Sequence, residues 1–230
     1  MRKLRRLSVA AALPVLLLST VSCAPRVRAV DGLWRETLNS GCLVWDPLPQ
    51  PDETITWTGA CLDGKASGRG TEVSRYRIGG AWKEERYTGD MHGGRLHGHG
   101  TLIYDNGDRY EGDFVESRRV GRGTYTHASG DRYEGDFRDD RRTGRGTLTY
   151  RQGGRYEGEF VDGLFDGTGT FTFPDGARYE GNFRGGMANG LGTLRESTGD
   201  IITGNWSNGC LRQGNRVATV GTTREKCGFK

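Results

Sequence analysis

Proline and long apolar segments are scarce in this chain of 230 residues. Only 6 residues are proline, which excludes a collagen-like chain and a proline-rich linker. The apolar run at residues 7–18 is about 12 residues long, whereas a membrane-spanning helix needs about 20. A P-loop, a nucleophile elbow and a dinucleotide-binding fingerprint are also missing. We therefore expect no spanning helix and no cofactor.

Beyond its first 22 residues, the chain has no excess of positive or negative charge. The chain has 33 Lys and Arg residues against 29 Asp and Glu residues. The segment before residue 23 contains four of the basic residues and no acid, and removing these four from the 33 leaves 29. The basic surplus therefore belongs to the N-terminal segment and does not indicate a nucleic-acid partner.

Glycine is the residue type in excess, with 39 of the 230 residues. Aromatic residues make up 10% of the chain, which argues against disorder because disordered chains contain few of them. A chain rich in both is typical of short strands joined by tight turns.

The first residues have the three-part layout of a secretory signal. A basic start precedes the apolar run and small polar residues follow it, so we predict an export signal at residues 1–22. The sequence TVSC ending at Cys23 resembles a bacterial lipobox, which would make Cys23 the acylated N-terminus and residues 23–41 an anchor and tether. Cleavage after Ala29 is the alternative. We expect a protein of the cell envelope that is lipid-anchored on the periplasmic side, or else soluble in the periplasm or secreted.

Five cysteines are an odd number for an exported protein. If Cys23 carries lipid, four remain, and they could pair in three ways. Proximity in the sequence favours the disulfides Cys42–Cys61 and Cys210–Cys227. Neither pair has the CxxC spacing of a zinc site, so we expect no metal.

A repeat of 23 residues occupies the middle of the chain, residues 87–201. Tyrosine stands first in every copy, glycine third, twelfth, fourteenth and twenty-first, and threonine fifteenth. The five copies begin at Tyr87, Tyr110, Tyr133, Tyr156 and Tyr179. Such self-similarity predicts a solenoid in which each repeat is stabilised by its neighbours.

Alternation with a period of two predicts a strand at the start of each repeat. Tyr133, Gly135 and Phe137 would point to a buried face, and Glu134 and Asp136 to solvent. A second strand is predicted from the glycine at position 14, after a loop rich in glycine and charge. Glycines at positions 12 and 21 would supply positive φ, and those at positions 3 and 14 would leave room for an aromatic ring.

The pattern Y-E-G-x-F-x-x-G-x-x-x-G-x-G-T resembles the MORN (membrane occupation and recognition nexus) repeat. Degenerate copies occur at residues 57–70 and 202–209, and an insertion at residues 73–86 precedes the regular array. The resemblance implies an all-β, elongated single-sheet solenoid of tandem β-hairpins. It also implies a non-enzymatic scaffold whose partner is an unknown envelope protein, or an anionic lipid or glycan.

The two cysteine pairs are expected to close caps at residues 42–86 and 202–230. A hairpin folded about Pro51-Asp52 would bring Cys42 opposite Cys61, and the C-terminal segment would double back in the same way. A clamped strand at each end would protect the edges of an open sheet.

Arginines recur at positions 9, 10 and 13 of the repeats, in the predicted loop. Translation along a solenoid would align them into a basic edge that binds anions. The candidates are Arg95, Arg118, Arg119, Arg122, Arg141, Arg142 and Arg145. Because Glu116, Asp139 and Asp140 dilute the charge, a solvated edge is the other interpretation.

Two further clusters suggest chemistry. Glutamates at position 2 recur beside the arginines that precede each repeat. A glycosidase needs two carboxyl groups with different pKa values, and glutamates in identical surroundings cannot provide them. His92, His97 and His99 share one loop, yet its glycine-rich flanks make a metal site improbable. We therefore expect a solvated lattice and no enzyme.

Overall fold

The structure is a computed structural model, and it describes residues 32–229. The regular elements of that range are all strands, and none of its residues forms a helix that could cross a membrane. The predicted signal at residues 1–22, the lipidation of Cys23 and the alternative cleavage after Ala29 lie outside the described residues.

Two compact units divide the described chain. One, the N-terminal unit, extends to Arg151 and includes Glu159–Leu164, and the C-terminal unit holds Gln152–Gly158 and the residues from Phe165 onward. The first eleven strands belong to the N-terminal unit: β1 (Leu33–Glu36), β2 (Leu43–Asp46), β3 (Thr54–Trp57), β4 (Ala60–Leu62), β5 (Lys65–Ile78), β6 (Ala81–His92), β7 (Arg95–Ile103), β8 (Arg109–Val115), β9 (Arg118–Thr126), β10 (Arg132–Arg138) and β11 (Arg141–Thr149). The others are β12 (Arg155–Val161), β13 (Leu164–Thr172), β14 (Arg178–Arg184), β15 (Met187–Arg195), β16 (Ile201–Trp206), β17 (Cys210–Gln213) and β18 (Arg216–Thr219).

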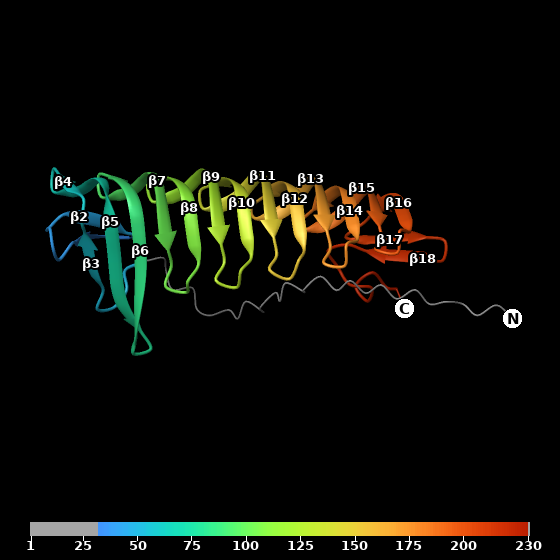
Figure 1. Ribbon diagram of the computed structural model, residues 1–230, viewed down its shortest axis with the longest axis horizontal. Coiled ribbons are helices and arrows are strands. Elements are labelled where there is room, and N and C mark those ends of the chain that lie inside the picture. Colours follow the sequence, from blue (N-terminus) through green and yellow to red (C-terminus); the bar gives the residue numbers. More distant parts are fainter. Residues whose placement is uncertain (1–31, 230) are drawn as a thin grey trace. The chain divides into compact units, whose positions relative to one another are not determined.

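A single sheet contains the strands β1 to β16, which confirms the all-β, single-sheet class (Figure 1). Its order is β1-β2-β5-β6 and then consecutive to β16, with β3 and β4 paired to β5. The neighbouring strands from β5 to β11 and from β13 to β16 pair antiparallel, whereas β2 pairs with β5 in the parallel direction. Strands β17 and β18 form a separate two-stranded sheet.

The second strand of each repeat begins five residues earlier than the sequence predicted. In the repeat of Tyr110 it starts at Arg118, position 9, after a two-residue turn of Glu116 and Ser117 with φ of 51° and 65°. Two consecutive positive φ values are the mark of the turn that best fits the twist of a hairpin. The predicted loop is therefore strand, and a shift of register after Gly112 absorbs the extra residues as a β-bulge.

The glycines of the repeat have the roles that the sequence predicted. At position 12, Gly121 has φ of 61° and occupies the bulge, and at position 21, Gly130 has φ of 102°. At positions 3 and 14, a Cβ on Gly112 or Gly123 would lie 2.5 Å from the Tyr110 hydroxyl oxygen. The tyrosine ring lies across bare backbone, so a larger residue at either glycine would displace it.

Tyrosines and phenylalanines fill the inner face of the repeats. The Phe137 ring meets Tyr110 and Tyr133 edge-to-face, with centroids 5.1 and 5.2 Å apart. Phe160 packs on Tyr133 in the same way at 5.0 Å. All four rings are at most 5% exposed, which confirms the predicted inward positions. Each ring contacts the next repeat as well as its own, so the core is shared between neighbours.

The N-terminal cap differs from the predicted hairpin. Strand β2 pairs with β1 and with Lys65 of β5, whereas β3 pairs with β5 from Thr54 to Trp57. The prediction of a hairpin about Pro51-Asp52 is therefore wrong. The strand β5 is 14 residues long, so β3 and β4 both pair with it and β3 does not pair with β2. A disulfide joins Cys42 to Cys61, whose Cα atoms are 5.7 Å apart.

The predicted tether is also part of the sheet in its second half. Residues 33–36 form β1, in which Trp34 pairs with Trp45 of β2. The two rings meet edge-to-face at 5.4 Å, and the Lys65 ammonium lies 4.5 Å from the Trp34 ring centre. These contacts fix part of the segment that the sequence predicted as a tether.

The C-terminal cap continues the core for one more strand. In β16, Trp206 takes the place of the inward phenylalanine, is 1% exposed and meets the Tyr179 ring at 5.2 Å. Leu211 of β17 covers the bare backbone of Gly204, where a Cβ would lie 2.9 Å from its methyl group. A disulfide joins Cys210 to Cys227, with a Cα separation of 5.7 Å.

Candidate functional site

The arginines at position 9 lie at the turn edge and pair with acids of the following repeat. Arg118 contacts Asp139 at 3.2 Å, and Arg141 contacts Asp162 at 3.0 Å. Arg95 makes the equivalent pair with Glu116 at 2.7 Å. Because each acid is the first residue of a turn, translation by one repeat brings it beside the arginine before it. The edge is a ladder of ion pairs whose charges compensate each other.

The arginines at position 10 lie on the inner face instead of the edge. The Arg119 guanidinium is 5.4 to 5.7 Å from the centres of three aromatic rings, Tyr110, Tyr125 and Phe137. Its Nε atom also contacts Asp140 at 2.9 Å. The side chain is 19% exposed, which makes it a packing residue rather than a free cation.

Arg142 repeats this arrangement in the next repeat. Its guanidinium lies 5.5 Å from the Tyr133 ring and 5.7 Å from the Phe160 ring, and donates a hydrogen bond to the Gly163 carbonyl at 2.9 Å. Burial lowers the pKa of the Arg142 guanidinium from its usual value. In the C-terminal unit, Phe165 occupies position 10 and stacks on Tyr156 at 3.7 Å. Position 10 thus covers the tyrosine ring whether its residue is charged or apolar.

The arginines at position 13 lie on the outer face. Arg122 is exposed and stands opposite Asp136 of β10 in the sheet register. Arg145 is exposed too, and its backbone N–H donates to the Asp136 carboxylate at 2.9 Å. The seven arginines therefore divide among the edge, the inner face and the outer face. The single basic edge expected from the sequence is wrong, because it assumed a loop where the structure has a strand with a bulge.

Ion-pair rungs cover the outer face. Arg109 contacts Glu111 at 2.6 Å, and Arg178 contacts Glu180 at 3.3 Å. The equivalent pairs in the repeats between them are Arg132–Glu134 and Arg155–Glu157. All eight side chains are at least 42% exposed, so the rungs form the solvated lattice that the sequence indicated.

The three histidines of the first repeat do not converge. His99 contacts Asp113 at 3.0 Å, while the rings of His92 and His97 lie 5.7 Å apart. In the part of the chain that the structure describes, no three His, Cys, Asp or Glu side chains are arranged to hold a metal ion.

A cluster of carboxyl groups beneath the N-terminal cap was missed by the sequence analysis. Burial and the neighbouring Glu53 raise the pKa of Asp46 to about 7, and burial and Asp46 raise the pKa of Glu72 to about 8. The buried Asp46 Oδ2 atom has no hydrogen-bond partner within residues 32–229. Glu72 stands at position 16 of the degenerate repeat, where Leu148 and Phe171 are buried. A charged residue at an inward position was the signal for this cluster.

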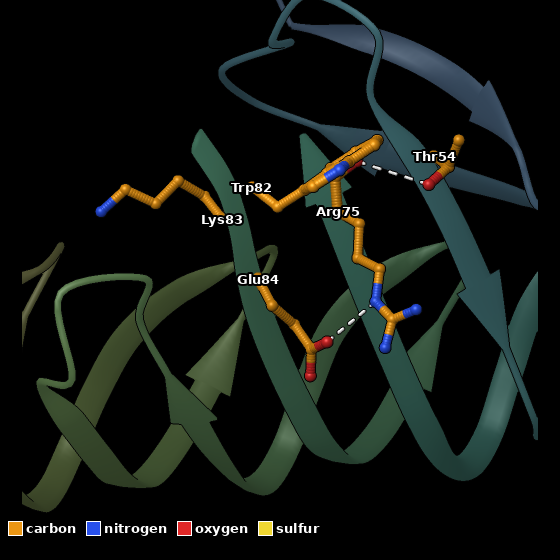
Figure 2. A pocket seen from close by; sticks show the side chains of 5 residues that line it. All are labelled: Thr54, Arg75, Trp82, Lys83 and Glu84. Atoms are coloured by element: carbon orange, nitrogen blue, oxygen red, sulfur yellow. Dashed lines mark hydrogen bonds and ion pairs between the residues drawn. The ribbon is translucent and has the colours of Figure 1, made fainter. Parts of the chain in front are cut away.

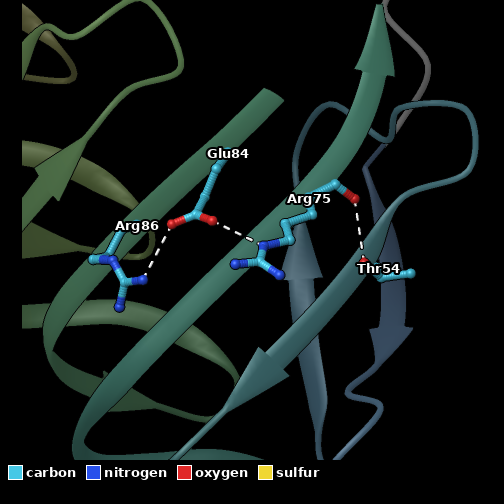
Figure 3. Close-up of polar contacts among 4 residues, drawn as sticks. All are labelled: Thr54, Arg75, Glu84 and Arg86. Carbon is cyan, nitrogen blue, oxygen red and sulfur yellow. Dashed lines mark hydrogen bonds and ion pairs between the residues drawn. The ribbon is translucent and has the colours of Figure 1, made fainter. Parts of the chain in front are cut away.

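An open depression of about 590 Å³ lies beside the insertion hairpin. Thr54, Arg75, Trp82, Lys83 and Glu84 line it, from β3, β5 and β6 (Figure 2). The Glu84 carboxylate joins two arginines, Arg75 at 2.8 Å and Arg86 at 3.1 Å (Figure 3). The Thr54 hydroxyl donates to the Arg75 carbonyl at 3.4 Å. These contacts hold β3, β5 and β6 together at the base of the hairpin and leave Trp82 exposed.

Comparison with known families assigns the repeats. The family model described as MORN repeat matches residues 87–109, 110–132, 133–155, 156–178 and 179–201. These are the five segments that the sequence and the register delimit. No curated protein matches the chain.

Proposed function

Because the chain belongs to the MORN-repeat family, we propose that it is a non-enzymatic scaffold of the cell envelope that binds another protein through its outer face. The ion-pair rungs carry this proposal. The inner face is filled by the protein's own tyrosine and phenylalanine rings, whereas the rungs are exposed and recur on the outer face of successive repeats. Within each unit, strands about 4.8 Å apart place successive rungs about 10 Å apart, a spacing that suits an extended partner.

The cell envelope is supported by the two disulfides, because structural disulfides are typical of exported proteins. An export signal at residues 1–22 and a lipid on Cys23 would deliver and hold the protein there. Mass spectrometry of the N-terminal peptide from the native envelope tests this part. A diacylglyceryl group on Cys23 is expected, and a free N-terminus at Val30 contradicts the anchor.

Binding of an anionic lipid or glycan through the arginine edge is the less favoured function. The edge arginines are paired with acids, and the position 10 arginines pack on aromatic rings. Exposed ion pairs of this kind are nearly neutral toward a distant anionic surface. Arg122 and Arg145 on the outer face would have to bind the anion instead.

Site-specific photo-crosslinking from the outer face tests the scaffold. A photoreactive side chain replaces Glu111 in one variant and Glu157 in another, and Asp175 in an exposed turn serves as the matched control. Both outer-face variants should give a protein adduct of the same mass in living cells, and the control should not. Adducts from Asp175 alone, or none from either outer position, would contradict the proposal.

A further inference from the structure

The insertion at residues 73–86 is a two-stranded extension that the five regular repeats lack. It continues β5 and β6, with pairs from Val73–Arg86 to Ile78–Ala81. Gly79 and Gly80 close it in a turn with φ of 57° and 82°. In Figure 1 this hairpin reaches beyond the loops that join β7 to β8 and β9 to β10.

The end of the hairpin exposes apolar side chains on both of its faces. Tyr76 is 6% exposed and belongs to the core, but Ile78 is 50% exposed and Trp82 is 60% exposed. Ile78 pairs with Ala81, and Trp82 stands opposite Arg77, so the two large side chains point to opposite sides of the hairpin. We call residues 77–82 the hairpin tip.

Positive charge accompanies these side chains. Residues 75–84 contain three basic residues, Arg75, Arg77 and Lys83, and one acid, Glu84. Arg75 is paired with Glu84, and Lys83 with Asp105 at 3.3 Å. The Arg77 guanidinium lies 4.6 Å from the Trp82 ring centre and has no ion pair within residues 32–229. The hairpin tip therefore combines an amphipathic ring, an aliphatic side chain and an uncompensated cation.

We propose that the hairpin tip inserts into the headgroup region of an anionic membrane and orients the protein on it. Tryptophan favours this region because its ring is apolar and its N–H can still meet water. An arginine beside it attracts anionic lipid. Two exposed side chains are too few for a stable protein interface, which needs about 600 Å² or more from each partner.

Attachment of the chain makes a small contact sufficient, and this step rests on the proposed lipid anchor at Cys23. The nine residues from Ala24 to Gly32 span at most about 32 Å when extended. A tether of that length holds the N-terminal unit at high effective concentration near the surface, so even a weak contact is occupied. The hairpin tip then fixes the orientation of the protein, while the anchor provides most of the affinity.

Quenching of tryptophan fluorescence by brominated lipid tests the insertion. Residues 24–230, which include every described residue, carry an N-terminal histidine tag in place of the lipid. The tag tethers the protein to vesicles of phosphatidylglycerol and brominated phosphatidylcholine that contain a chelating lipid. Wild type and the matched control Trp34→Phe should be quenched, and Trp82→Phe should not. Absence of quenching in wild type, or equal quenching in Trp82→Phe, would overturn the proposal.

Partition without the tether gives a second readout. Trp82→Ala should weaken binding to phosphatidylglycerol vesicles about tenfold, the factor for one large buried side chain. Leu191→Ala removes an apolar side chain that is 70% exposed, against 60% for Trp82, from another place and should leave partition unchanged. Thermal melting should be the same in both variants. The tagged protein carries no lipid, so the vesicle experiments test insertion of the hairpin tip alone. Mass spectrometry of the N-terminal peptide tests the anchor at Cys23, so failure of one proposal can be told from failure of the other.

Discussion

Replacing Phe137 with alanine is expected to lower the free energy of unfolding by about 4 kcal/mol. The side chain is 5% exposed and is enclosed by Tyr110, Tyr133 and the Arg119 guanidinium. Removal of a buried phenylalanine costs about 3–5 kcal/mol through lost transfer energy and the cavity that remains. Each edge-to-face aromatic pair contributes about 0.5–1.5 kcal/mol to stability. Because Phe137 makes two such pairs, we expect a cost above the lower end of the range for phenylalanine.

Two variants of the same strand provide controls. Phe137→Leu keeps most of the buried volume, so it should cost less than about 2 kcal/mol. The remaining cost comes from the loss of both edge-to-face ring contacts. Glu134→Ala removes an exposed rung of the outer face and should change stability by at most about 1 kcal/mol. The order of the three effects tests which face of β10 is buried.

Urea unfolding with amide hydrogen exchange is the appropriate assay. Repeat arrays can lose cooperativity, so a single transition is not a safe measure of one site. Exchange at the amides of β10 and β11 reports the local opening that Phe137→Ala should promote. If Glu134→Ala accelerates exchange more than Phe137→Ala does, the inner and outer faces are assigned the wrong way round.

Three further predictions follow from side chains that differ in environment. Arg119→Ala should cost about 1–2 kcal/mol because three rings lose their cover, whereas Arg118→Ala at the exposed edge should cost under about 1 kcal/mol in the same thermal melts. Gly123→Ala should lower the melting temperature, because its Cβ would lie 2.5 Å from the Tyr110 hydroxyl, and an unchanged melt would contradict the close approach. The pKa of Asp46 is raised by burial to about 7, so the folded state keeps a proton that the unfolded state releases. This contribution to stability is complete below about pH 4 and is lost as the pH rises through about 7. Asp46→Asn should therefore reduce the fall in melting temperature over that range and leave the part that Glu72 contributes.

The repeat could be predicted from the sequence because its period is visible five times. The inward Tyr133 and Phe137, and the positive φ of Gly121, follow from alternation and from the rarity of glycine in strands. The start of the second strand could not be predicted in this way. Glu116 and Ser117 are not typical residues for a turn with two positive φ values, so the glycine at position 12 suggested a loop that is in fact a bulge.

The placement of the arginines failed for the same reason. A shift of five residues in the strand start moves Arg119 from the edge to the inner face and Arg122 to the outer face. Register in a strand has a period of two, so such an error reassigns every side chain between the turn and the bulge. The strand pairing of the N-terminal cap could not be predicted either, because it depends on the length of β5, to which both β2 and β3 pair.

Departures from the repeat are more informative about function than the repeat itself. A side chain that recurs in every copy, such as the tyrosine of position 1, is explained by packing against the next copy. Glu72 replaces an apolar residue of that core with a carboxyl group whose pKa is raised to about 8 by burial, and Trp82 stands on an extension that the core does not need. The stacking of repeats requires neither residue. Glu72 has the cost of burying an acid, and Trp82 has the cost of exposing a large ring. Both features lie in the N-terminal unit, outside the five regular repeats, so a function that distinguishes this protein from a bare array of repeats is to be sought there.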